Sequence, residues 1–150
     1  MAQVATVLNQ HYTRERPGNL TRVTDLSGND SDKTLTVPAN ELWKLDFVFA
    51  AFTTTATQGD RQILLRVSDG TYTFAYAAPA APQPASSTEL YHFGVPYGSA
   101  SEDLAGYHFV PLPVDVLPAG YELRIYDVNA VDAAADDLTI RFMVNAYHIN

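Results

Sequence analysis

The sequence VPANELWKLDFVFAAFT, residues 37–53, decides the predicted fold. A Pro-Ala-Asn turn opens it, and the apolar run that follows is rich in aromatic side chains, as β-strands are. At a strand's two-residue period the apolar residues fall into two sets: Trp43, Leu45, Phe47, Phe49 and Ala51 on one face, and Leu42, Val48, Ala50 and Phe52 on the other. Lys44 and Asp46 interrupt the second set, and the run is too short and too charged to span a membrane. We therefore predict a long strand with one face fully buried and the other partly buried.

A weaker copy of this scheme comes later in the chain. The sequence LPAGYELRI, residues 117–125, again places an apolar residue and Pro-Ala before a strand that carries Glu and Leu. In both copies a loop rich in Ala, Thr and Asp follows, residues 54–60 and 130–137, and then another strand. The copies are too short to define a repeat family. They predict a two-sheet architecture with two similar corners.

The rest of the chain shows short alternating segments and turn signals, and no amphipathic helix is predicted. Asp69-Gly70 predicts a hairpin between strands at 61–69 and 71–77, and the last strand, 138–148, alternates most regularly. We predict an all-β fold: an antiparallel two-sheet sandwich of jelly-roll type with about eight strands. Long strands and unequal loops favour the jelly roll over an immunoglobulin domain. Residues 1–33, the most polar part, are predicted to form an N-terminal arm or edge segment ahead of a sandwich domain at 34–150.

Composition excludes several classes of function. The chain has 150 residues, a net charge of −8 and no cysteine, which excludes disulfide frameworks, thiolate metal sites and cysteine nucleophiles. An acidic surface argues against binding to nucleic acid and to anionic membranes. The N-terminal sequence lacks the pattern of a signal peptide, so we expect synthesis in a cytoplasm.

Catalytic and metal-binding patterns are weak. The four histidines, at positions 11, 92, 108 and 148, form no His-x-His or His-Glu-x-x-His pair, although His92 and His108 could meet on neighbouring strands. Asp132, Asp136 and Asp137 lie close together, as in a glycosidase pair, but a short alanine loop does not predict a pocket that raises a carboxyl pKa. We expect Asp136 and Asp137 to shape the turn before the last strand. The sequence thus predicts a protein that is not an enzyme and has no cofactor or metal.

Two irregular segments, residues 1–33 and 77–87, are candidate interfaces. The second is a Pro/Ala loop whose prolines favour an extended form, and it is either a plain connection or a projecting arm. Tyrosines suit surfaces that bind proteins or sugars, but for most aromatic residues we favour core packing and cross-strand pairing. The candidate interface residues are Tyr12, Arg14, Arg16, Tyr76, Pro79 and Pro82.

Four segments together resemble a family of small β-sandwich virion proteins from tailed bacteriophages. They are TLTVPANELW at 34–43, TTTATQGDRQI at 53–63, LPAGYELRI at 117–125 and DAAADDL at 132–138, within a resemblance that spans residues 34–148. The likeness is one of pattern, without a catalytic motif. It implies a structural protein of the virion, made in the host cytoplasm: a capsid decoration (cement) protein or a head-neck or tail component.

Our first hypothesis is a decoration protein that forms a homotrimer, binds the major capsid protein or other virion proteins, and clamps capsomers through its N-terminal segment. The second is a head-neck or tail adaptor, which would form a larger ring. A third, of another class, is a carbohydrate-binding module of a receptor-binding apparatus, with surface tyrosines as stacking platforms.

Overall fold

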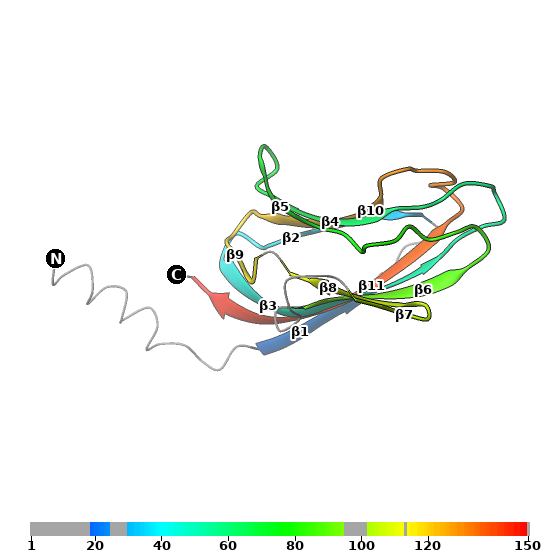
Figure 1. Cartoon of the computed structure of the whole chain (residues 1–150). Helices are drawn as coiled ribbons and strands as arrows, with labels where there is room; N and C mark the ends of the chain where they lie inside the picture. The colour runs from blue at the N-terminus through cyan, green and yellow to red at the C-terminus, as the bar shows by residue number, and fades with distance from the viewer. Residues whose placement is uncertain (1–18, 25–29, 95–101, 113, 150) are drawn as a thin grey trace, which may run out of the picture.

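The protein is a two-layered β-sandwich (Figure 1). The computed structural model describes residues 19–24, 30–94, 102–112 and 114–149, and all regular elements in these ranges are strands. The strands are β1 (Asn19–Thr24), β2 (Asp32–Thr36), β3 (Glu41–Thr53), β4 (Ile63–Ser68), β5 (Thr73–Ala77), β6 (Thr88–Gly94), β7 (Glu102–Leu104), β8 (Tyr107–Pro111), β9 (Val116–Leu117), β10 (Glu122–Asp127) and β11 (Asp137–His148). The predicted all-β sandwich is confirmed. It has more strands than expected, partly because β7 and β9 are only three and two residues long.

The strands divide into a large and a small sheet. The large sheet has the order β1-β11-β3-β6-β8-β7, with β9 also paired to β3, and the small sheet has the order β2-β10-β4-β5. The chain crosses repeatedly between the two layers, as it does in jelly rolls. One pair, β6 with β8, is parallel, so a purely antiparallel arrangement is wrong at this point. The β7–β8 hairpin places its second strand against β6, and β8 therefore runs in the same direction as β6.

The core fills the space between the sheets with inward-facing side chains from both layers. Phe52, Phe93 and Phe142 are fully buried at its centre, and the Trp43 ring packs against Phe142 with a centroid separation of 5.3 Å. Full burial of such a side chain contributes about 1.5–3 kcal/mol. The regular alternation predicted for the last strand is confirmed, because every second residue of β11 from Leu138 to Val144 is buried.

The long strand β3 changes face at a β-bulge. Leu45 pairs with Val144 and Phe47 with Met143, so Asp46 is the extra residue. Before the bulge the core-facing residues are Trp43 and Leu45, and after it they are Val48, Ala50 and Phe52. The two faces predicted from strict alternation are therefore wrong beyond Asp46, because one inserted residue exchanges the faces of everything that follows.

The two Pro-Ala corners are similar, as the repeated scheme predicts, and they lie side by side at one end of the sandwich. In each corner the N–H three residues after the proline donates to the proline carbonyl, at 3.0 Å for Pro38 and 3.1 Å for Pro118. The corners also bond to one another: Val37 donates its N–H to the Tyr121 carbonyl, and Gly120 donates to the Val37 carbonyl, both at 2.9 Å. Each corner carries the chain from one sheet to the other.

Candidate functional site

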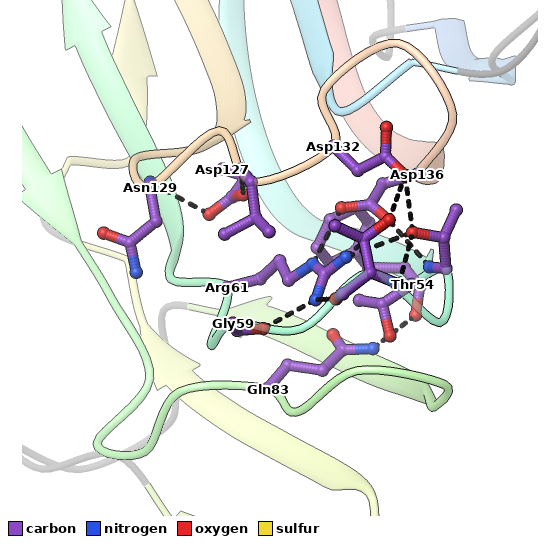
Figure 2. A network of polar contacts seen from close by, with 12 residues as sticks. Thr54, Gly59, Arg61, Gln83, Asp127, Asn129, Asp132 and Asp136 are labelled. Carbon is purple, nitrogen blue, oxygen red and sulfur yellow. Dashed lines mark hydrogen bonds and ion pairs between the residues drawn. The ribbon is translucent and has the colours of Figure 1, made fainter.

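The loops that follow the two corners meet at the opposite end of the sandwich, in a buried polar network (Figure 2). Arg61 lies at its centre with no exposed side-chain surface. Its Nε donates to Asp136 Oδ2 at 2.9 Å, and its terminal nitrogens reach the Thr57 and Gly59 carbonyls at 2.7 and 2.6 Å and the Thr55 hydroxyl at 3.2 Å. Every nitrogen of the guanidinium group therefore has a partner inside the protein.

The acidic loop supplies the acceptors of this network. Asp136, also fully buried, accepts the Thr55 N–H at 2.7 Å, and Asp132 accepts the hydroxyls of Thr55 and Thr57 at 2.7 and 2.8 Å. These two hydroxyl bonds, with the nearby Arg61 charge, lower the pKa of Asp132. A glycosidic general acid requires a raised pKa, so the arrangement gives Asp132 a role in holding loops together and none as an acid.

The Pro/Ala loop is tied to the same network through Gln83, which is fully buried. The Arg61 and Gln83 backbones exchange two hydrogen bonds of 2.8 Å. The Gln83 side-chain amide donates to the Phe52 carbonyl at 2.9 Å, and its oxygen accepts the Tyr91 hydroxyl at 2.7 Å. The middle of this segment is thus a firmly held connection. Of the candidate residues on it, Pro79 is buried and Pro82 is exposed.

The two strand histidines lie on neighbouring strands, but their rings do not meet. His108 is buried, stacks on Tyr91 at 4.6 Å and lies 2.5 Å from a Glu89 carboxylate oxygen. His92 points to the other face, between Phe49 and Phe109, with centroid separations of 4.9 and 5.4 Å, and burial lowers its pKa. Within the described ranges, no group of three His, Asp or Glu residues could hold a metal ion.

A candidate interface lies on the small sheet instead, at the edge strand β5. Tyr72, Phe74 and Tyr76 are 68, 52 and 57% exposed. Arg66, on the neighbouring strand β4, pairs across the strands with Tyr76. We call these four residues the β5 surface. The preceding hairpin confirms the Asp69-Gly70 prediction: the Asp69 carboxylate accepts two backbone N–H groups, and Gly70 has a φ of 87°. Phe74 also stacks on Tyr121 at 5.2 Å.

β5 differs from the other strands that end the two sheets. Among the described strands, β1 carries Arg22, β2 carries Asp32 and Lys33, and β7 carries Glu102 and Asp103, whereas β5 (Thr-Phe-Ala-Tyr-Ala) has no charged residue and no proline. Proteins normally protect an edge with charges, prolines or bulges, because an unprotected edge pairs with other chains. The edge here has one bulge, opposite Val67 and Ser68, and is otherwise open.

Sequence reasoning found part of this surface. Tyr76 was a candidate residue, and it belongs to the β5 surface as the cross-strand partner of Arg66. Tyr72 and Phe74 were predicted only as members of the same strand, and Arg66 was not singled out; the signal that would have found them is an uncharged aromatic strand after an Asp-Gly turn. Tyr12, Arg14 and Arg16 lie outside the described residues.

Comparison of the chain with protein-family models, with curated proteins and with solved structures gave no match. The described part of the chain contains no helix that is long and apolar enough to cross a membrane.

Proposed function

We propose that this protein is a non-enzymatic structural protein of a phage virion, a capsid decoration protein that binds head proteins and stabilises the head. The observation that supports this most is the β5 surface, where three exposed aromatic side chains lie at an open edge strand and Arg66 lies on the neighbouring strand β4. Tyrosine and arginine dominate the binding energy of protein interfaces. The resemblance of four sequence segments supports the virion setting of this proposal, and the exposed β5 surface supports the choice of contact site.

The same four segments form hydrogen-bonded contacts at both ends of the sandwich that carries this surface. Two of them, 34–43 and 117–125, supply the two corners and the strands that leave them, and the other two supply the Thr55, Arg61 and Asp136 contacts of the buried network. A protein that clamps other subunits benefits from a pre-organised surface, because little conformational freedom is then lost on binding. The acidic residues that would suit catalysis are used to hold the loops.

The first test is whether the chain is a component of the particle. Mass spectrometry of purified virions, from the phage whose genome encodes the chain, should detect it at a copy number comparable with that of the head proteins. Its presence in infected cells together with its absence from virions would refute the proposal. Light scattering of the purified protein should give the mass of a trimer, whereas a six- or twelve-fold ring would move the assignment to the neck or tail.

The second test adds the protein back to heads that lack it. We expect Tyr76→Ser to weaken binding at least tenfold, because truncating a central interface tyrosine typically costs about 2 kcal/mol or more. Tyr107→Ser is the matched control, since Tyr107 is a 45% exposed tyrosine of β8 in the large sheet. Equal binding by both variants and the wild type would exclude the β5 surface as the contact.

A carbohydrate-binding module is the second candidate, and the same exposed rings favour it. Aromatic side chains that lie open to solvent can stack on sugars, and Tyr72 and Tyr76 are both more than half exposed. A glycan array would decide, because a specific hit that Tyr76→Ala abolishes would support the module. An array without hits would leave protein binding as the function of the surface.

A further inference from the structure

We infer that β5 is the acceptor edge for an extended, acidic segment of another protein, which adds a strand to the small sheet and brings a carboxylate to Arg66. This inference rests on the proposed function, because it names the chemistry of the partner that binds the β5 surface. Two independent features lead to it: the open edge of β5 and the unpaired arginine beside it.

The edge supplies the backbone half of the interaction. β5 ends the order of the small sheet, so one side of its backbone faces β4 and none of the described residues pairs with the other side. Three of its five residues, Thr73, Phe74 and Tyr76, are exposed, and none of the five is charged. An extended segment that pairs with such an edge gains a ladder of backbone hydrogen bonds, while alternate side chains give specificity.

Arg66 supplies the charge. It lies on the outer face of the small sheet, with Tyr76 as its cross-strand neighbour on β5 and Arg124 as its neighbour on β10. The Arg66 Nε is buried without a hydrogen-bond partner, and the side chain forms no ion pair with any described residue. A partly buried charged side chain without an ion-pair partner is costly, and a partner's carboxylate placed at the guanidinium group of Arg66 would offset that cost.

Nearby acids do not serve this purpose, because they are already engaged. Asp32 is held by Arg124, whose Nε donates to it at 2.8 Å and whose guanidinium lies 4.3 Å from the centre of the Tyr126 ring. The Glu122 carboxylate lies toward Ser68, with a 3.5 Å contact to the hydroxyl. Arg124 is therefore already paired with Asp32, whereas Arg66 has no ion pair with the described residues, so Arg66 is the positive charge that suits an acidic partner.

The spacing of a sheet fixes where the partner's acid must lie. An added strand would be about 5 Å from β5 and about 10 Å from β4, a gap that an arginine and a glutamate span when they lean toward each other over Tyr76. The residues that flank the glutamate on its face of the added strand would pack against Phe74 and Tyr76 as cross-strand pairs. A lysine in place of the glutamate would be repelled by Arg66.

The probe is a pair of short synthetic peptides, acetyl-Thr-Val-Glu-Val-Thr-Val-amide and the same sequence with lysine in place of glutamate. Each is titrated into the full-length protein while amide chemical shifts are followed by NMR. We expect the glutamate peptide to shift the amides of Thr73–Ala77, and the lysine peptide to bind about tenfold more weakly, as expected for the loss of a charge-assisted hydrogen bond.

Two variants assign the effect to Arg66. Arg66→Gln should bring the glutamate peptide to the affinity of the lysine peptide, whereas Arg141→Gln, which removes an exposed arginine from the large sheet, should leave binding unchanged. A thermal melt of each variant shows that it is folded. Equal affinities for the two peptides, or no shift within Thr73–Ala77, would overturn the inference.

A second copy of the chain is the other occupant that an open edge could take. Concentration-dependent shifts of the Thr73–Ala77 amides without peptide, with a doubled mass by light scattering, would show that β5 pairs with itself and would also overturn the inference. These outcomes are separate from the test of the virion role, which depends only on the presence of the chain in purified particles.

Discussion

Replacing Arg61 by methionine tests whether the buried network holds its end of the sandwich together. Both Arg61 and Asp136 have side chains with no exposed surface, and their closest nitrogen–oxygen distance is 2.9 Å. Methionine fills similar space but leaves the Asp136 carboxylate buried without a cation, and removing one partner of a buried ion pair costs about 3–5 kcal/mol. The Thr57 and Gly59 carbonyls also lose their donor, but the loop backbone there is exposed, so water replaces part of that loss. We expect a decrease of about 4 kcal/mol in the free energy of unfolding.

Urea unfolding followed by the fluorescence of the single tryptophan, Trp43, measures this decrease. Arg124→Met is the matched control, because the Arg124–Asp32 pair has side chains that are 30 and 44% exposed and such pairs contribute only about 0–1 kcal/mol. Arg61→Lys should lie between the two, since it keeps the charge and loses the forked hydrogen bonds. A decrease for Arg61→Met no larger than that for Arg124→Met would refute the reasoning that this pair is a structural centre.

Three further predictions use the same unfolding assay. Asp132→Asn should flatten the dependence of stability on pH in acid. Hydrogen bonds from the Thr55 and Thr57 hydroxyls lower the pKa of Asp132 from 3.8, so the carboxylate contributes fully to stability above pH 3.8 and loses this contribution as the pH falls through the lowered pKa. Parallel curves for the variant and the wild type would contradict this. Gly59→Ala should destabilise the fold by about 1–3 kcal/mol, because Gly59 has a φ of 132° and an added Cβ would lie 3.1 Å from the Val131 methyls. The control, Gly106→Ala, should cost about 1 kcal/mol, because Gly106 has a φ of 86° but no heavy atom within 4 Å of an added Cβ. Equal losses of stability would count against the close contact with Val131. Phe52→Ala, at a fully buried position, should cost about 3–5 kcal/mol, and Phe74→Ala, at an exposed one, less than about 1 kcal/mol; a reversed order would mean that the core is misassigned.

Strand positions and the two corners could be predicted, because hydrophobic alternation and turn residues are local signals. The bulge at Asp46 could not, since a charged residue within an apolar run is compatible with either face until its partner strand is known. The parallel pairing of β6 with β8 depends on how the β7–β8 hairpin docks, which no local pattern encodes.

The candidate site likewise has one part that local sequence patterns predict and another that only the fold reveals. The sequence predicts a strand over residues 71–77, which include Tyr72, Phe74 and Tyr76, but how far these side chains are buried depends on what packs against them, and in the fold all three are more than half exposed. The partnership of Arg61 with Asp136 joins residues 75 positions apart. Each residue taken alone reads as an ordinary loop residue, so only the fold shows that they are a pair.

The closure of both ends of the sandwich by distant segments sets the order in which the chain can fold. The hydrogen bond from Thr55 to Asp136 joins residues 81 positions apart. The first corner likewise cannot complete its hydrogen bond from Val37 until Tyr121 has been made. On the ribosome, the two ends therefore cannot form until residues 121 and 136 have emerged, and the open β5 edge is exposed to other nascent chains throughout that time. Non-local closure of this kind places folding on a timescale of about milliseconds to seconds, so a cell that makes many copies at once would need chaperones or early capture by a partner to keep this edge from mispairing.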